Sequence, residues 1–337
     1  MKTSVIDIGL QWDRPELTLA LSAAMKQNDA VQVIVNTTGS SGIKKRVLLS
    51  IDAISASADL SNERVGAKTG DVWSLLLPIN HIAGLNVLAR AEKLGSTVVS
   101  ADQRADYAAI VPTQLHRALF GDRKLLEHLQ NCKTVLVGGS PASKVLLDAA
   151  SKAGISVLTT YGMTETSGGC VYSKKALTGV SVMVDGSGRL MIKGPILASG
   201  YEDNQNLWDQ NFKDRWFVTS DLGKITDNEI EVIGRIDDVV ITGGENVSLA
   251  AIENELTAGF PGINFLATAI PDAEWGQKIC LISNSEIDYD RITELLKTNL
   301  GKQFVPKEFL IMQQIPEIGI GKPDRVKASQ IFIDKQR

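Results

Sequence analysis

Hydrophobic positions follow two alternating periods over the first half of the chain. Between residues 15 and 26 they recur at helical spacing, and the unbroken apolar run at 31–35 is typical of a buried strand. The same alternation continues to about residue 162. The predicted strands are 73–77, 97–100, 134–137 and 156–159, and the predicted helices are 85–94, 114–120 and 143–153. This order favours a doubly wound α/β sheet, in which ligands bind in loops at the carboxyl ends of strands.

The pattern changes after Tyr161. Short alternating runs between residues 171 and 235, with turn signals at Asp185–Gly188 and Asp227–Asn228, predict a small β subdomain. From about Val239 the pattern predicts a compact α+β unit, with helices at 249–256 and 289–300 and strands at 263–270, 278–283 and 309–315. We therefore expect a large N-terminal domain, residues 1–236, that changes from α/β to β near residue 170. A small C-terminal domain, residues 238–337, follows it.

Composition and charge narrow the class of protein. The 337 residues are 44% hydrophobic and 22% charged, which is typical of a globular chain. The net charge of −4 gives no basic field for nucleic acid, so an anionic ligand needs a local pocket. Cys132, Cys170 and Cys280 are too far apart for a disulfide framework or a CxxC metal site, and they fit a reducing cytoplasm. No apolar stretch is long enough to span a bilayer, so we expect no membrane insertion.

A polar, glycine-rich segment follows the predicted strand at 31–35. Its residues are Thr37, Thr38, Gly39, Ser40, Ser41 and Gly42, and Lys45 lies just beyond them. Consecutive amides, hydroxyls and one lysine can surround an anion such as a phosphate. The spacing is not that of a P-loop, which argues against a P-loop ATPase. On the residues alone, a flexible polar turn is an equally good interpretation.

A second polar segment, Tyr161–Thr166, follows the predicted strand at 156–159. Its Thr164 hydroxyl and Glu165 carboxylate could bind a phosphate oxygen and the Mg²⁺ that accompanies it. A plain turn into the β subdomain is the alternative that the residues leave open.

Taken together, these segments and several later ones resemble the adenylate-forming superfamily of acyl-CoA synthetases, luciferases and peptide-synthetase adenylation domains. The later motifs, in the order of the family, are Gly138-Gly139-Ser140, Thr219-Ser220-Asp221, Gly234–Asp238, Gly243-Gly244-Glu245 and Gly321–Arg325. The resemblance covers residues 37–325 and implies that family's fold, with a mobile C-terminal domain. Because most members carry a long segment before the phosphate loop, we expect the N-terminal subdomain to be reduced here.

The resemblance also implies which residues bind ATP and Mg²⁺. The glycine-rich segment and Lys45 would surround the phosphates, Thr164 would bind the α-phosphate and Glu165 the Mg²⁺. Asp221 would accept hydrogen bonds from the ribose, with Arg235 nearby. The remaining nucleotide-binding residues would be Gly138, Gly139, Ser140, Tyr161 and Gly162.

Three residues near or within the C-terminal domain take roles from the same resemblance. Lys322 matches the lysine that reaches the acyl carboxylate and the α-phosphate during adenylation, where preorganised charge lowers the barrier by about 3 kcal/mol or more. Asp237 matches the hinge about which the small domain rotates between half-reactions, and Gly244 matches the entrance for the thiol of coenzyme A.

The segment Leu77–Leu85, with Arg90 after it, is similar to the o-succinylbenzoate–CoA ligases of menaquinone biosynthesis, in their short actinobacterial form. Their substrate has two carboxylates, and an arginine such as Arg90 is the natural bidentate partner of the one that is not activated. His81 is the second predicted substrate residue. Nine residues of straight helix would put His81 and Arg90 on opposite faces, so they share a pocket only if His81 precedes the helix. A structural hydrogen bond is the alternative for His81.

These observations predict a two-domain, AMP-forming acid–CoA ligase of the cytoplasm. ATP, Mg²⁺ and coenzyme A are the expected cofactor and co-substrates, and o-succinylbenzoate is the expected acid. A homodimer is left open. The alternatives are a ligase or adenylating enzyme for another aryl or short-chain acid, and a catalytically silent nucleotide-binding protein that kept the fold.

Overall fold

The computed structural model describes residues 4–26, 31–38, 44–260, 262–318 and 322–335. Its central six-stranded sheet has the order β4-β5-β6-β7-β8-β9, with β4 to β7 parallel and the last three antiparallel. The strands are β4 (Trp73–Ser74), β5 (Tyr107–Ile110), β6 (Thr134–Val137), β7 (Val157–Met163), β8 (Gly168–Tyr172) and β9 (Lys175–Ala176).

The strand order reverses at β4. Ser74 pairs in parallel with Val99 on one side and with Ala108 of β5 on the other, so the chain crosses first to one edge of β4 and then to the opposite edge. Residues 97–100 were predicted as a full strand, but in the structure only Val99 makes this isolated bridge. A reversal of this kind defines the doubly wound fold and places a ligand crevice between the loops after β4 and β5.

Helices cover both faces of this sheet. Alternate residues of β5 point to opposite sides: Tyr107 and Ala109 pack with α3, whereas Ala108 and Ile110 pack with α4 to α6. The helices are α3 (Ile82–Lys93), α4 (Pro112–Phe120), α5 (Arg123–Gln130) and α6 (Lys144–Lys152). The doubly wound prediction is confirmed at this level.

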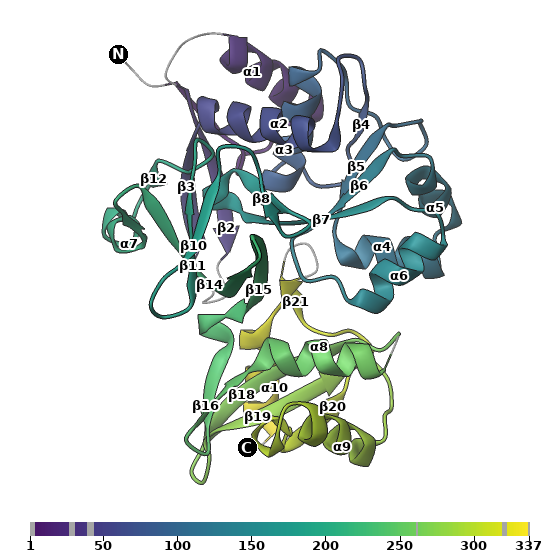
Figure 1. The fold of residues 1–337 in the computed structure, drawn as a ribbon, viewed down its shortest axis with the longest axis vertical. Helices are drawn as coiled ribbons and strands as arrows, with labels where there is room; N and C mark the ends of the chain where they lie inside the picture. Colours follow the sequence, from purple (N-terminus) through teal and green to yellow (C-terminus); the bar gives the residue numbers. More distant parts are fainter. Residues whose placement is uncertain (1–3, 27–30, 39–43, 261, 319–321, 336–337) are drawn as a thin grey trace.

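A second sheet, of order β1-β2-β3-β12, packs with α1 and α2 against α3 (Figure 1). Its elements are β1 (Ser4–Asp7), α1 (Arg14–Lys26), β2 (Val31–Thr38), β3 (Lys44–Ser50), α2 (Ile51–Val65) and β12 (Gly200–Tyr201). Helix α2 has no apolar stripe that a pattern could reveal, because its buried face contains small and polar residues such as Ala58, Ser57 and Ser61.

A third, five-stranded antiparallel sheet forms the predicted β subdomain. Its elements are β10 (Ser181–Val184), β11 (Arg189–Lys193), α7 (Gln205–Asn211), β13 (Phe212–Lys213), β14 (Trp216–Thr226) and β15 (Glu229–Arg235). Asp227 and Asn228 join β14 to β15 with φ of 50° and 64°. Positive φ at both central residues is what a tight hairpin turn requires, and Asp and Asn tolerate it best after glycine.

The elements after β15 form a fourth sheet, of order β17-β16-β19-β18 with β20 beside β19. Helices α8 and α9 pack on one face and α10 on the other, and Figure 1 shows this group at one end of the molecule. The elements of this group are β16 (Val239–Thr242), β17 (Glu245–Ser248), α8 (Leu249–Gly259), β18 (Phe265–Asp272), β19 (Gly276–Ser283), α9 (Tyr289–Asn299), β20 (Glu308–Ile311), β21 (Glu317–Ile318), β22 (Lys322–Pro323) and α10 (Arg325–Lys335). Strands β21 and β22 pair with each other in a separate two-stranded sheet.

Two further expectations can be compared with the structure. Cys132, Cys170 and Cys280 are free and buried, and burial raises the pKa of each thiol to about 12. In the described part of the chain, none of the helices combines the length and apolar character that crossing a membrane needs.

Candidate active site

A short 3₁₀ turn, η1 (Thr164–Thr166), follows β7 and holds Glu165. The Thr166 hydroxyl accepts a hydrogen bond from the Met163 N–H at 2.9 Å and donates to the Gly168 carbonyl at 2.7 Å. Ser167 ends the turn with φ of 49°, an uncommon backbone conformation for a residue with a side chain. Its carbonyl accepts hydrogen bonds from the Ser57 hydroxyl at 2.8 Å and the Asn86 amide at 2.6 Å. Side chains of α2 and α3 therefore fix the turn that carries Glu165.

Glu165 is buried and has one side-chain partner among the described residues. The Tyr201 hydroxyl donates to its Oε1 at 2.8 Å, and the Ala198 N–H donates to its backbone carbonyl at 2.8 Å. In the described part of the chain no three His, Cys, Asp or Glu side chains gather as a metal cluster. One carboxylate beside the Thr164 hydroxyl fits Mg²⁺ nonetheless, because this ion is usually held by one or two carboxylates together with substrate phosphates and water.

Lys45, in the second sheet, lies near Tyr201, the hydrogen-bond partner of Glu165. It lies in β3 opposite Thr37 of β2, so Thr37 and Thr38 extend the strand where the sequence predicted a loop. The Lys45 ammonium is 5.1 Å from the centre of the Tyr201 ring. The tyrosine therefore lies between two predicted ATP-binding residues, Lys45 and Glu165. The other predicted phosphate residues, Gly39, Ser40, Ser41 and Gly42, lie outside the described part of the chain.

The predicted ribose residue, Asp221, is a buried carboxylate with two partners. The Tyr161 hydroxyl donates to its Oδ2 at 2.7 Å, and Arg235 Nη1 donates to its Oδ1 at 3.0 Å. The hairpin register sets the second contact, since Asp221 of β14 lies opposite Arg235 of β15. Burial raises the pKa of Asp221, and the nearby guanidinium and phenol only partly oppose that rise. Each oxygen keeps a further lone pair, with which a ribose hydroxyl could bond.

Gly138, Gly139 and Ser140 follow β6, and Tyr161 and Gly162 lie in the neighbouring strand β7. The structure therefore brings these predicted adenine-side segments together at adjacent strand ends. Packing already requires glycine at two of them: an added Cβ would lie 2.2 Å from Thr160 Oγ1 at Gly138 and 2.0 Å from the Gly168 carbonyl oxygen at Gly162.

The predicted hinge, Asp237, lies in a 3₁₀ turn, η2 (Ile236–Asp238), between β15 and β16. Arg235 binds it with both ends of the guanidinium, Nε at 3.1 Å and Nη2 at 2.9 Å. The next residue, Asp238, instead accepts a hydrogen bond from Arg325 Nε at 2.9 Å. The two adjacent carboxylates therefore have different partners. Asp237 pairs with an arginine two residues before it, and Asp238 pairs with one 87 residues after it.

Two C-terminal residues of the prediction are placed as follows. Lys322 lies in β22, whose backbone pairs with Ile318 of β21, and Figure 1 shows β21 at the end of this group that faces the rest of the molecule. Gly244 lies in the tight turn between β16 and β17 with φ of 82°. Figure 1 shows β16, which precedes this turn, in the C-terminal group, and β7, which precedes η1, in the rest of the molecule.

His81 is the N-cap of α3, where its Nδ1 accepts a hydrogen bond from the Ala83 N–H at 3.2 Å. It therefore precedes the helix, in the loop after β4, at the reversal of strand order. Gln114 of α4 connects the loops after β4 and β5, because its amide donates to the Leu76 carbonyl at 2.9 Å. His81 thus lies at the end of the sheet where a doubly wound fold binds its ligands.

Arg90 lies elsewhere, in the core. Its guanidinium is 4.9 Å from the centre of the Trp73 ring, and Nη2 donates to the Tyr172 hydroxyl at 3.3 Å. Nine residues of helix separate it from His81, a rise of about 13 Å, and Trp73 begins β4 rather than ending it. The structure places the two predicted substrate residues at opposite ends of α3, His81 at its N-cap and Arg90 in its last turn.

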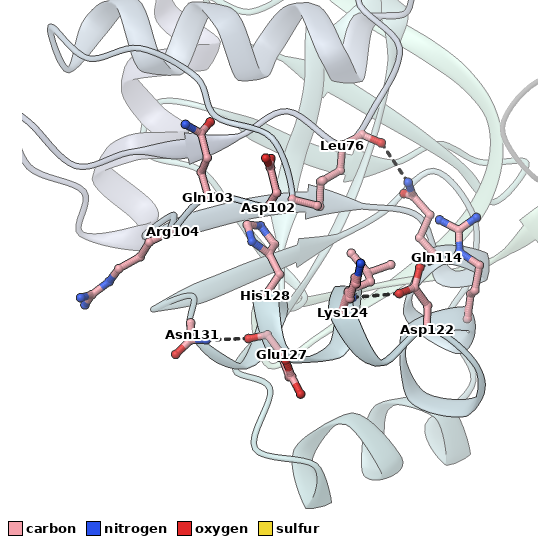
Figure 2. Close-up of a pocket in the computed structure, with 13 residues that line it drawn as sticks. Leu76, Asp102, Gln103, Arg104, Gln114, Asp122, Lys124, Glu127, His128 and Asn131 are labelled. Carbon is pink, nitrogen blue, oxygen red and sulfur yellow. Dashed lines mark hydrogen bonds and ion pairs between the residues drawn. The ribbon is translucent and has the colours of Figure 1, made fainter.

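A cavity of about 930 Å³ opens on the side of α4 and α5, and Figure 2 shows charged side chains of both signs around it. His128 is buried at its wall, 2.9 Å from the Ser74 hydroxyl. Of the predicted site residues that the structure describes, none lines this cavity.

Sequence reasoning missed Tyr201 because it follows no periodic run. It belongs to a strand of two residues, and its role becomes visible only when β12 pairs with β3.

Comparisons with known proteins show which family the chain resembles. The model of the AMP-binding enzyme family matches residues 10–202. A probable 2-succinylbenzoate–CoA ligase of Mycobacterium tuberculosis is 34% identical, over 93% of this chain and 88% of that one. A 2-succinylbenzoate–CoA ligase of Listeria monocytogenes is 27% identical, over 88% of this chain and 69% of the relative.

Solved structures are similar in fold. ATP-bound MatB of Rhodopseudomonas palustris has a TM-score of 0.81 at 26% identity, over 92% of this chain and 69% of that one. The o-succinylbenzoate–CoA synthetase of Bacillus subtilis with its acyl-adenylate has a TM-score of 0.77 at 24% identity, over 88% of this chain and 68% of that one. The family predicted from the motifs is confirmed, and the chain belongs to the AMP-binding, adenylate-forming enzymes.

Proposed function

We propose that this protein joins a carboxylic acid to coenzyme A at the expense of ATP, and that the acid is 2-succinylbenzoate. The observation that carries the proposal is the 34% identity, over 93% of the chain, to a relative with that activity in its name. The geometry is compatible with it, because Tyr201 lies between Lys45 and Glu165, and Asp221 contacts Tyr161 of β7, the strand that precedes Glu165.

In the first half-reaction a carboxylate oxygen attacks the α-phosphorus of ATP, and pyrophosphate leaves. Lys45 and Thr164 would hold phosphate oxygens, Asp221 the ribose, and Lys322 the region where charge concentrates on the attacking and attacked groups. Glu165 would hold Mg²⁺, which when bound neutralises phosphate charge. Positioning the acid against ATP replaces an encounter of two free molecules and accounts for much of the acceleration.

In the second half-reaction the thiol of coenzyme A attacks the acyl carbon, and AMP leaves. We propose that η2 is the hinge between the N-terminal part, residues 1–236, and the C-terminal part, residues 238–337. Rotation about Asp237 would withdraw Lys322 and bring the Gly244 turn to the adenylate, a step of the kind that often limits turnover. Figure 1 shows β16 and β7 in different parts of the molecule, an arrangement in which this rotation would still have to occur.

The acid would bind beside His81, at the crevice between the loops after β4 and β5. We assign Arg90 to the core rather than to the acid, since it packs beside Trp73. The free cysteines suit a reducing compartment, and we place the reaction in the cytoplasm. A homodimer stays a prediction.

A panel of acids tests this proposal. We expect ATP–pyrophosphate exchange that depends on 2-succinylbenzoate, with a kcat/KM at least tenfold above that for benzoate and short-chain acids. Preference for another acid would contradict the proposed substrate but not the proposed reaction. Absence of exchange with every acid, together with retained ATP binding, would indicate the catalytically silent alternative.

A further inference from the structure

The strand β12 connects Tyr201 to the β2–β3 hairpin, whose strands carry the predicted phosphate residues Thr37, Thr38 and Lys45. Tyr201 lies opposite Val47 of β3, and the Glu202 N–H donates to the Arg46 carbonyl at 2.9 Å. On its other side the same segment reaches η1, through the hydrogen bond from the Ala198 N–H to the Glu165 carbonyl at 2.8 Å. A stretch of four residues, 198–201, therefore joins the β2–β3 hairpin to the turn that holds the metal ligand.

The Tyr201 ring is immobilised by its neighbours. It is 3% exposed, and Trp208 packs edge-on against it, with the ring centres 5.5 Å apart and the planes at 89°. Lys45 lies over the ring at 5.1 Å, the arrangement of a cation–π contact. The position of the hydroxyl is therefore fixed before any ligand binds.

That hydroxyl has one acceptor, Glu165 Oε1 at 2.8 Å. A tyrosine hydroxyl carries one hydrogen, and here it donates that hydrogen to the carboxylate. Among the described residues no hydrogen bond reaches Oε2 of Glu165. The contact therefore occupies one carboxylate oxygen and leaves the other available to a metal ion.

We propose that Tyr201 is a positioning residue for the Mg²⁺ of the ATP complex: its hydroxyl orients Glu165, while its ring sets Lys45 relative to that carboxylate. The inference rests on the proposed function, since it assumes that Glu165 binds Mg²⁺ with ATP. Groups that orient a metal ligand through a hydrogen bond typically change metal affinity by 10–100-fold when removed. Through one side chain, the tyrosine would thus couple Lys45 of the β2–β3 hairpin to Glu165 of η1.

Tyr201→Phe tests the inference, because it removes the hydroxyl and keeps the ring against Trp208 and Lys45. The measurement is the affinity for ATP by calorimetry, with Mg²⁺ and with a chelator, on the full chain without acid or coenzyme A. Wild-type protein should bind ATP more tightly with Mg²⁺. The variant should lose about tenfold in affinity with Mg²⁺ and little with the chelator.

The chain offers a closely matched control. Tyr107 donates to Asp71 Oδ2 at 3.3 Å and has Lys133 over its ring at 5.8 Å, at the start of β5 rather than beside η1. Tyr107→Phe therefore removes a similar phenol–carboxylate contact, and it should leave the Mg²⁺ effect on ATP affinity unchanged. An equal loss in both variants would indicate a general structural effect and overturn the inference.

A double-mutant cycle with Glu165→Gln decides whether Tyr201 acts through Glu165. We expect Tyr201→Phe to have no further effect on Mg²⁺-dependent affinity in the Glu165→Gln background. Additive losses, or a wild-type response to Mg²⁺ in Tyr201→Phe, would overturn the inference alone. A wild-type protein that binds ATP equally well with and without Mg²⁺ would instead overturn the proposed metal role of Glu165, and the inference with it.

Discussion

Arg325 donates a hydrogen bond through Nε to Asp238 Oδ1 at 2.9 Å, and the two residues are 87 positions apart in the chain. The same guanidinium binds Glu253 of α8, with Nη2 3.0 Å from Oε2, and the Ala267 carbonyl of β18 at 2.8 Å. Asp238 follows the predicted hinge directly, whereas Arg325 lies three residues beyond Lys322. One largely buried arginine, with 16% of its side chain exposed, therefore fastens the lysine-bearing segment to the chain just past Asp237.

Breaking this connection should destabilise the C-terminal elements. Arg325→Ala leaves Asp238 and Glu253 without their cation, and removing one partner of a buried pair costs about 3–5 kcal/mol. We expect a loss of that size in the free energy of unfolding, measured by denaturant titration. A loss below about 1 kcal/mol would mean that the arginine contributes no more than a surface ion pair.

Lys322→Ala should separate the two half-reactions. We expect acyl-adenylate formation to fall by about a hundredfold or more, since lost transition-state charge stabilisation of this kind costs about 3 kcal/mol. Thioester formation from supplied acyl-adenylate should stay within a few-fold of wild type. Equal losses in the two assays would contradict the assignment of Lys322 to adenylation.

Asp237 can be tested with two substitutions that share the loss of its carboxylate. Asp237→Ala breaks the bidentate contact with Arg235 and leaves the backbone free, whereas Asp237→Pro also fixes φ and restricts the residue before it. If η2 is the hinge, coenzyme A transfer should fall much further in the proline variant, while adenylate formation stays similar in the two. The same transfer rate in both would place the pivot elsewhere.

Arg90→Ala should affect stability rather than specificity. The residue packs over Trp73 in the core, and a desolvated cation–π contact contributes about 2 kcal/mol. We expect a comparable loss in the free energy of unfolding, with KM for 2-succinylbenzoate and for a monoacid changed by the same small factor. A selective rise in KM for the diacid would instead indicate that Arg90 binds the second carboxylate.

Much of the fold could be predicted because its apolar periods are regular. The strand at 134–137 is apolar on both faces and the helix at 114–120 on one, and both form within a few residues of the predicted bounds. Helix α2 was not predicted, because polar residues occupy part of its buried face. Ser57 and Ser61 are buried there through hydrogen bonds, to the Ser167 carbonyl and the Tyr172 hydroxyl respectively. Patterns of hydrophobicity cannot register a face built in that way.

In the candidate site, too, the sequence predicts some contacts and not others. Contacts set by strand register, such as Asp221 with Arg235, connect residues that a motif can name in advance. Tyr201 meets Glu165 only because β12 pairs with β3 across the molecule, and no local pattern predicts that pairing. Arg90 differs in another way: its chemistry suits a carboxylate, but the residue type alone does not reveal that its guanidinium lies 4.9 Å from the centre of the Trp73 ring.

An isotope transfer experiment tests the central claim most directly. The full chain would turn over 2-succinylbenzoate labelled with ¹⁸O in both carboxyl groups, with unlabelled ATP, Mg²⁺ and coenzyme A, and the AMP would be analysed by mass spectrometry. If the carboxylate attacks the α-phosphorus, each thioester formed leaves one ¹⁸O in the phosphate of AMP. Unlabelled AMP, or ADP as the nucleotide product, would contradict an acyl-adenylate intermediate.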